Sequence, residues 1–373
     1  MPVQHKPSYA DLTAFLESRD VMDIAGNALL ILQDDKEIYR HTSGKGDCDT
    51  LYRVFSMTKP VTVTAAMQLW EKGLLSLEDP ISRYLPEYEN VTVWDDAAKN
   101  CVPADTPVTI RHLLTMTAGF CYGGDWAEVP RRTSAVRAEL EKEHPGSAYT
   151  TREFARAMAQ VPLAFQPGTH WQYSLCHDIL GAVIEQVSGM TLGAYMKQHI
   201  FDPLGMAHTF FRCPEELQFR MAEPRDPSGD ASYGARARYE SGGGGLLSTL
   251  DDYMIFANTL TRGGISEKGV RILKKETIDL IRQDQLNDHT RPDYNWSYLK
   301  GYGYGLGMRT LLDPALCGIP GSKGEFGWCG VLGTWVLMDP ERRLTVVYMH
   351  QHYPNYEEYV QTNLRRLIYG LID

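Results

Sequence analysis

The sequence has little of what membrane, secreted and nucleic-acid-binding proteins need. It contains no run of about 18 apolar residues, so we expect no membrane span and no membrane partner. The first residues, MPVQHKPSYADL, hold no basic segment followed by an apolar one, so no secretory leader is visible, although a leader already removed would leave no trace. The formal net charge of −10 argues against the basic surface on which nucleic acids bind.

Cysteine is also scarce, with seven residues in 373, and the signatures of common cofactor sites are missing. An odd number of cysteines without a C-x-x-C pair favours free thiols in a reducing compartment, so we expect a cytoplasmic protein. There is no HExxH, no P-loop, no G-x-G-x-x-G and no G-x-S-x-G, and the histidines lack the spacing of metal ligands. We therefore expect no metal and no cofactor.

What is present is an ordinary globular composition, with strand signals at both ends of the chain and helix signals between them. NALLILQDDKEIYRH (27–41) and GTWVLMDPERRLTVVYMHQ (333–351) each read as two strands joined by a turn. We expect an α/β (α+β) fold in which an antiparallel sheet is flanked by helices. In this fold, residues 1–75 and 295–373 form a sandwich domain, and residues 76–294 form an inserted, mostly helical domain.

The motif Ser-x-x-Lys occurs twice, at Ser56–Lys59 and at Ser297–Lys300. Only the first precedes a helical stretch, TKPVTVTAAMQLWEKG, whose apolar residues indicate burial. Residues i and i+3 share a helix face, so Lys59 is expected beside Ser56. A serine becomes a nucleophile when a base lies within hydrogen-bond reach, and burial near a helix N-terminus lowers the pKa of a lysine. By itself the motif supports this interpretation and a helix-capping serine equally.

Further segments extend the pattern around Ser56 along most of the chain: GLLSLEDPISRYLPEY (73–88), IRHLLTMTAGF (110–120), FQPGTHWQYSLCHDILGAVIEQVSG (165–189), GGGGLLSTLDDYMIF (242–256) and FGWCGVLGTWVLMDP (326–340). In this order they closely resemble the serine β-lactamase and penicillin-binding-protein superfamily. The likeness is greatest to its class C-type branch, which includes the family VIII carboxylesterases. The resemblance implies an α/β sandwich with a helical domain and an active site at their junction.

The resemblance also implies catalytic residues. Ser56 and Lys59 match the first catalytic element of the superfamily. The second, Tyr-x-Asn in the lactamases, falls on Tyr173-Ser174-Leu175. Tyr173 would then relay protons, with its phenolate favoured by the nearby lysine ammonium; without the family it would read as an aromatic packed at a helix start. Leu175 takes the substrate-binding place of the asparagine but cannot hydrogen-bond a substrate amide, and family VIII esterases vary at this place.

The third element, Lys-Thr-Gly in the lactamases, falls on Trp328-Cys329-Gly330, which become candidate substrate-binding residues. The missing lysine would have held a substrate carboxylate, whereas Trp328 offers an apolar wall for an uncharged acyl or alcohol portion. Ordinary strand packing is the alternative for Trp328, and Cys329 reads as a small packing residue. The oxyanion donors implied by the family are the backbone N–H groups of Ser56 and Val331.

The expected function is that of a serine hydrolase working through an acyl-enzyme. A carboxylesterase for short-chain esters, with weak β-lactam hydrolysis as a side activity, fits the substitutions best. The alternatives are a β-lactamase, a D-amino-acid peptidase or an acyltransferase of the same fold and, from another class, a penicillin-sensing receptor that stalls after acylation. The expected partner is a small-molecule ester or amide, and the sequence predicts no oligomeric state.

Two loop regions carry weaker expectations. Residues 213–245 form either a mobile segment or a wall of the cleft. Within them, Gly242 to Gly245 either bring backbone close to the cleft, ahead of a helix capped by Ser248, or form a plain flexible loop.

Overall fold

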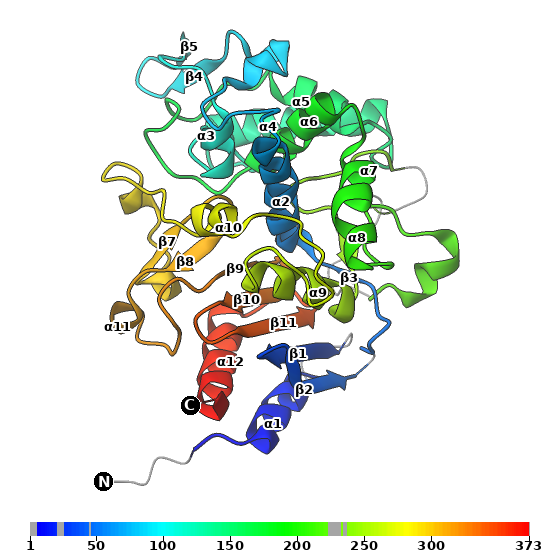
Figure 1. Cartoon of the computed structure of the whole chain (residues 1–373). Helices are drawn as coiled ribbons and strands as arrows, with labels where there is room; N and C mark the ends of the chain where they lie inside the picture. Colours follow the sequence, from blue (N-terminus) through cyan, green and yellow to red (C-terminus); the bar gives the residue numbers. More distant parts are fainter. Residues whose placement is uncertain (1–5, 21–25, 45, 223–232, 234–236, 373) are drawn as a thin grey trace.

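A seven-stranded antiparallel sheet, in the order β2-β1-β11-β10-β9-β8-β7, joins the two ends of the chain (Figure 1). The computed structural model describes residues 6–20, 26–44, 46–222, 233 and 237–372. The strands of this sheet are β1 (Asn27–Gln33), β2 (Lys36–Ser43), β7 (Tyr302–Tyr304), β8 (Arg309–Leu311), β9 (Phe326–Cys329), β10 (Trp335–Asp339) and β11 (Leu344–His350). Both hairpins expected from the sequence are present, and β1 pairs with β11 between them.

The first hairpin closes with a tight turn between β1 and β2, and its register shifts once, between Ile31 and Leu32. Asp34 and Asp35 both have positive φ, 52° and 64°, as the two central residues of a tight hairpin turn require. Aspartate tolerates this conformation better than most residues. The turn therefore lies at the position expected from the sequence.

Helices cover both faces of the sheet (Figure 1). On one face, α1 (Tyr9–Asp20) and α12 (Glu357–Ile372) pack side by side and share an apolar core with alternate residues of β1, β10 and β11. On the other face, α9 (Leu250–Thr261) lies against β1, β10 and β11, and α2 (Thr58–Glu71) reaches β9. The alternation of side chains along each strand gives two cores, one on either side of the sheet. The α/β fold class expected from the sequence is confirmed.

The middle of the chain is mostly helical and surrounds α2. All residues of α2 from Thr58 to Leu69 are buried, and the helix contacts α6 and α7. The remaining helices are α3 (Ile110–Leu114), α4 (Glu128–Glu143), α5 (Thr151–Met158), α6 (Cys176–Ser188), α7 (Leu192–Met196), α8 (Asp202–Leu204), α10 (Lys275–Ile281) and α11 (Pro314–Cys317). Two small sheets pair β3 (Tyr52–Arg53) with β6 (Leu247–Ser248) and β4 (Thr92–Asp95) with β5 (Asn100–Pro103). The division into a sandwich domain and a helical domain stays a prediction.

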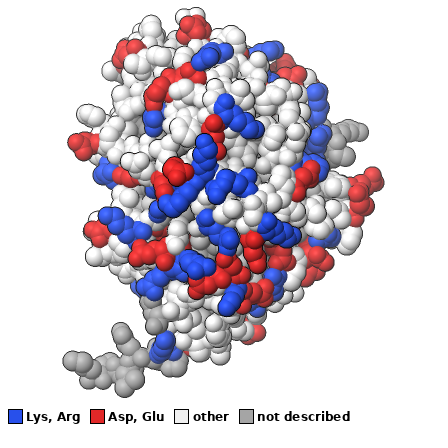
Figure 2. All heavy atoms as spheres, viewed as in Figure 1, with Lys and Arg blue, Asp and Glu red and all other residues white. Residues whose placement is uncertain are grey.

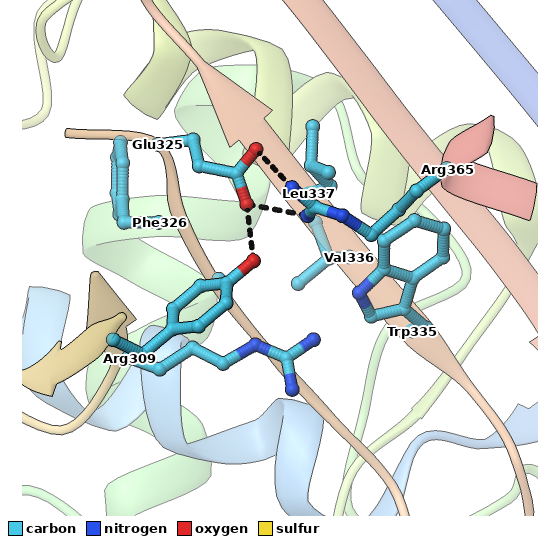
Figure 3. A pocket seen from close by; sticks show the side chains of 9 residues that line it. Arg309, Glu325, Phe326, Trp335, Val336, Leu337 and Arg365 are labelled. Carbon is cyan, nitrogen blue, oxygen red and sulfur yellow. Dashed lines mark hydrogen bonds and ion pairs between the residues drawn. The ribbon is translucent and has the colours of Figure 1, made fainter. Parts of the chain in front are cut away.

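A buried ion pair ties α12 to the sheet. Glu325, just before β9, and Arg365 of α12 are 3% and 4% exposed, and their side chains bond at 2.8 Å (Figure 3). The hydroxyls of Tyr302 and Tyr369 also donate to this carboxylate, both at 2.8 Å. A buried pair with its remaining acceptor sites filled holds its two elements in one relative position, because separating them would leave an unpaired buried charge.

Charged side chains of both signs are interspersed over the face of the molecule seen in Figure 2. In the part of the chain that the structure describes, no helix combines the length and apolar character needed to cross a bilayer.

Candidate active site

Ser56 lies in a short turn of 3-10 helix, Phe55–Met57, which joins β3 to the buried helix α2. The preceding residue, Phe55, has a φ of 43°, a strained value for a residue with a large side chain. Neither this turn nor α2 has a side-chain cap, and the residue at the N-cap of α2 is Met57. The interpretation of Ser56 as a helix cap is therefore wrong.

Lys59 is completely buried, and its ammonium group points at Ser56. Its Nζ donates to Oγ of Ser56 at 3.1 Å, to the Oη of Tyr122 at 3.2 Å and to the carbonyl oxygen of Gly243 at 2.7 Å. Burial lowers the pKa of Lys59 to about 8, and the carboxylate of Asp178 acts in the opposite direction. A substantial fraction of Lys59 is therefore neutral near pH 8, which is the state that can accept a proton.

Tyr173 lies between Lys59 and Trp328 of β9. Nζ of Lys59 lies 4.5 Å from the centre of its ring, and its hydroxyl is hydrogen-bonded to Ser56 and accepts a bond from Nε1 of Trp328 at 3.1 Å. Burial nevertheless raises the pKa of Tyr173, outweighing the two hydrogen bonds that lower it. The expectation of a favoured phenolate is wrong, because desolvation dominates and the ammonium faces the ring rather than the hydroxyl.

The glycine run completes the surroundings of Lys59 by approaching it through the backbone. A Cβ on Gly243 would overlap Oδ2 of Asp178, so any other residue there would have to displace this carboxylate. Of the two expectations for this run, the close approach of backbone is the one the structure supports. The helix that follows is capped by Thr249, whose side chain accepts from the N–H of Asp252, and not by Ser248.

Asp178 and Tyr122 are members of the site that the sequence reasoning missed. Asp178, in the first turn of α6, is 2% exposed and accepts from Tyr239 Oη at 2.6 Å, from Ser241 Oγ at 2.5 Å and from the N–H of Gly243 at 3.3 Å. It therefore holds the loop whose carbonyl group accepts from Lys59. An acidic residue in the first turn of an apolar helix, five residues after Tyr173, was the available signal.

Gly330 brings the third element against the Ser56 turn. A Cβ at this position would lie 2.6 Å from the carbonyl oxygen of Val54 and 3.3 Å from Cβ of Phe55, so the two segments touch through backbone. Val331 follows Gly330 in the turn after β9 and is 48% exposed. Trp328 is buried on the Tyr173 side of the strand.

Two other members of the predicted set lie elsewhere. The side chain of Leu175 is 4% exposed and belongs to the main apolar core. Cys329 alternates with Trp328 along β9, so its side chain packs at the core beneath α12, where Sγ donates to Oε1 of Glu357 at 3.0 Å. Burial, and next the negative charge of Glu357, raise the pKa of Cys329 well above its usual value, which keeps the thiol protonated.

No group of three or more histidine, cysteine, aspartate or glutamate side chains with the geometry of a metal site occurs among the described residues. The region 213–245, expected to be mobile or to form a wall of the cleft, is only partly covered, because residues 223–232 and 234–236 lie outside the described residues. Within the covered part, a 3-10 helix runs over Glu215–Arg220, and Oη of Tyr233 donates to the carbonyl oxygen of Gly244 at 3.3 Å.

Comparison with known proteins places this chain in a family. The Beta-lactamase family model matches residues 17–370. Protein Rv1367c of Mycobacterium tuberculosis is 33% identical over 90% of this chain and 89% of its own, and the esterase EstB of Burkholderia gladioli is 28% identical over 87% and 85%. The solved structure of EstCE1, a hydrolase with promiscuous acyltransferase activity, is 27% identical and superposes with a TM-score of 0.79 over 97% of this chain and 100% of that one. The family resemblance and the enzyme class expected from the sequence are confirmed, and the chain belongs to the Beta-lactamase family.

Proposed function

We propose that the protein is a serine hydrolase that acts through an acyl-enzyme and that its main substrates are short-chain carboxylic esters. The observation that carries the proposal is the 3.1 Å contact between Nζ of Lys59 and Oγ of Ser56, with the lysine fully buried and its pKa lowered to about 8. A neutral lysine at this distance is a general base for the serine hydroxyl.

In the proposed reaction, Oγ of Ser56 attacks the ester carbonyl carbon and its proton passes to neutral Lys59. The tetrahedral oxyanion is held by the N–H groups of Ser56 and Val331, each such donor being typically worth about 10²–10³ in rate. When the intermediate collapses, the alkoxide leaving group takes a proton from the hydroxyl of Tyr173. The proton held by Lys59 then passes to that oxygen, for which Nζ must move from the face of the ring, 4.5 Å from its centre, to the hydroxyl. Water then attacks the acyl-enzyme carbonyl and Lys59 accepts its proton. As the bond between the acyl carbon and Oγ of Ser56 breaks, Lys59 gives this proton to Oγ, and the carboxylic acid is released with Ser56 and neutral Lys59 restored.

The preference for esters rests on Trp328 and Leu175. In the lactamases the third element provides a lysine for the substrate carboxylate, whereas here the indole of Trp328 donates to Tyr173 and offers an apolar surface. Leu175 supplies no hydrogen bond to a substrate amide. The name of EstB as an esterase supports the same substrate class. A β-lactamase or D-amino-acid peptidase activity is correspondingly expected to be weak.

The test is a comparison of wild type, Ser56→Ala and the matched control Ser297→Ala, which removes the serine of the second, exposed Ser-x-x-Lys. Each protein is assayed with p-nitrophenyl butyrate and with a chromogenic cephalosporin. We expect ester turnover that is lost only in Ser56→Ala, with little cephalosporin cleavage. Dominant cephalosporin turnover would contradict the ester preference, and ester turnover surviving in Ser56→Ala would contradict the mechanism.

Acyl transfer to an alcohol is the second candidate, and it is favoured by the similarity to EstCE1, a hydrolase with promiscuous acyltransferase activity. The same acyl-enzyme serves both reactions, since only the second nucleophile differs. Adding a primary alcohol to the p-nitrophenyl butyrate assay and quantifying the new butyrate ester by gas chromatography separates transfer from hydrolysis.

Two further expectations complete the proposal. The active site lies where the sheet-forming ends of the chain meet the helical middle, since Ser56, Tyr173 and Trp328 come from these different parts. The cytoplasm remains the proposed location, supported by all seven cysteines being free thiols.

A further inference from the structure

Several aromatic side chains next to Tyr173 form what we call the aromatic wall, namely Trp296, Tyr298 and Trp328. The ring of Trp328 lies 5.4 Å from that of Tyr173 and 6.4 Å from that of Trp296. Trp296 in turn stacks on Tyr298, with ring planes 4° apart and centres 6.4 Å apart. Trp296 is 37% exposed, so this end of the wall is accessible from solvent.

The wall comes from two segments that are separated in the sequence. Trp328 belongs to β9, an inner strand of the sheet that is hydrogen-bonded to β8 on one side and to β10 on the other. Trp296 and Tyr298 belong to the loop before β7, which contains only two single turns of 3-10 helix, Arg291–Asp293 and Ser297–Leu299. A loop of this kind needs side-chain contacts to keep an exposed indole in one position.

Glu357, in the first turn of α12, bonds to both segments. Its Oε1 accepts from Oη of Tyr298 at 2.6 Å and from Sγ of Cys329, the neighbour of Trp328, at 3.0 Å. Nη1 of Arg309 lies 3.8 Å from the same oxygen. The carboxylate is 20% exposed and Arg309 only 5% exposed, so the charges are screened little by solvent.

The two donors to Glu357, the hydroxyl of Tyr298 and the thiol of Cys329, keep their protons at neutral pH. Burial raises the pKa of Tyr298 and that of Cys329, and the negative charge of Glu357 acts in the same direction on both. Hydrogen bonds to a charged acceptor are stronger than those between neutral groups. Tyr298 and Cys329 therefore remain hydrogen-bond donors to Glu357.

We propose that Glu357 is a positioning residue that holds Trp296 and Tyr298 against Trp328 and so sets the selectivity of the enzyme for esters with a bulky aromatic group. This inference rests on the proposed ester hydrolysis at Ser56. Glu357 does not touch the reacting atoms, because its contacts are with Tyr298, with the Cys329 face of β9 and with Arg309. Its loss is expected to displace the wall while leaving the contacts of Ser56 and Lys59 intact.

The experiment uses three esters that differ in where an aromatic group sits. Methyl butyrate has none, 2-naphthyl butyrate has it on the alcohol side and methyl 2-naphthylacetate on the acyl side. Glu357→Ala and Tyr298→Phe, which keeps the ring but removes its hydroxyl, are expected to lower kcat/KM for at least one naphthyl ester about three- to tenfold, the worth of one well-placed aromatic contact. The loss should appear in KM, with methyl butyrate unaffected.

Three further variants distinguish positioning from a general loss of structure. The double variant Glu357→Ala with Tyr298→Phe should lose no more selectivity than Glu357→Ala alone, because both remove the same contact. Glu357→Gln, whose side-chain carbonyl oxygen still accepts both bonds, should restore most of the selectivity. Arg366→Ala, at an exposed position further along α12, should behave as wild type.

An unchanged ratio between naphthyl and methyl esters in Glu357→Ala would overturn the inference, and so would an equal fall for all three substrates. Ser56→Ala assayed in parallel separates this result from the function itself. If Ser56→Ala abolishes turnover while Glu357→Ala leaves selectivity unchanged, the positioning role is wrong and the proposed hydrolase stands. Turnover that persists in Ser56→Ala would overturn the proposed function.

Discussion

Nζ of Lys59 donates to Oγ of Ser56 at 3.1 Å while the whole lysine side chain is excluded from solvent. Burial is what makes this pair chemically useful, because it brings the pKa of Lys59 down to about 8. At pH 7 about a tenth of the molecules then hold a neutral lysine beside the serine, a far larger fraction than an exposed lysine would provide. The pH dependence, the proton transfer and the stability of the protein should all depend on this pair and its neighbours.

The pH dependence of turnover should reflect Lys59. We expect kcat/KM for p-nitrophenyl butyrate to rise about tenfold per pH unit at low pH and to level off above an apparent pKa near 8. Since the carboxylate of Asp178 raises the pKa of Lys59, Asp178→Asn should move the rising limb to lower pH. Profiles measured from pH 6 to 9.5 test both statements.

Asp252→Asn is the matched control for this profile, because Asp252 is similarly buried but lies in α9 and is bonded to His208 and Thr209. If the rising part of the kcat/KM profile stays at the same pH in Asp178→Asn, or moves to higher pH, Asp178 does not raise the pKa of Lys59.

Proton transfer through Tyr173 can be tested without disturbing the packing of its ring. Tyr173→Phe should lower kcat about 10²–10⁴-fold with little change in KM, which is the usual contribution of a positioned acid–base group. Trp328→Phe removes the donor to Oη of Tyr173 but keeps an aromatic ring, so the loss should be smaller, about fivefold.

Tyr294→Phe provides the control for these variants. The ring of Tyr294 packs against that of Trp171, with the ring centres 4.8 Å apart. Its buried hydroxyl makes no hydrogen bond to any residue that the structure describes. Its removal should leave kcat unchanged. A Tyr173→Phe enzyme as active as Tyr294→Phe would exclude Tyr173 from the proton path.

Burying Lys59 should also leave a signature in the stability of the fold. Its pKa is about 8 in the folded protein against 10.5 in the unfolded chain, so between these values the unfolded chain binds more protons. The contribution of Lys59 to the free energy of unfolding must therefore rise with pH in this window. Relative to Lys59→Met, the wild type should gain about 2 kcal/mol between pH 7 and pH 9.5. Urea unfolding of both proteins at the two pH values gives the difference between their free energies of unfolding, in which the contributions of other titrating groups cancel. If this difference stays constant or falls with pH, the prediction is wrong.

Two neighbouring glycines, Gly243 and Gly244, differ in how much space a Cβ would find. A Cβ on Gly243 would overlap the Asp178 carboxylate, whereas a Cβ on Gly244 would meet its nearest atom, in Phe55, at 3.7 Å. Gly243→Ala should therefore displace the carbonyl group that accepts from Lys59 and reduce kcat, and Gly244→Ala should be tolerated. Equal activity of the two variants would show that the loop adjusts without consequence for Lys59.

Much of the fold could be predicted from the sequence because its signals are local. The alternation in 27–41 and 333–351 and the turn residues between the strands identify the hairpins, and the apolar periodicity near 360–371 identifies α12. One sheet built from both ends of the chain was expected, but the pairing of β1 with β11 was not predicted, because local patterns do not show which strands are neighbours.

The site was predictable where residue type dictates chemistry and unpredictable where three-dimensional surroundings do. Ser56, Lys59 and Tyr173 are brought together as the family resemblance implied. The direction of the Tyr173 pKa was wrong, because it depends on how much water reaches the hydroxyl. Asp178 was missed because its contacts come from the loop near Tyr239 and Ser241, more than sixty positions away in sequence.

The order of strands in the sheet has a consequence for how this protein must be made. β11 lies between β1 and β10, yet it is the last of the described strands in chain order, so it is synthesised after all of its neighbours. Until residues 344–350 emerge, the β1–β2 hairpin has no inner neighbour, and an isolated hairpin is marginal in water. Ser56 is therefore synthesised early, but β9, which bears Trp328, and the turn that holds Val331 can pack beside it only after most of the chain has been made. A chain that ends before β11 lacks the strand that pairs with both β1 and β10, so we expect it to be inactive.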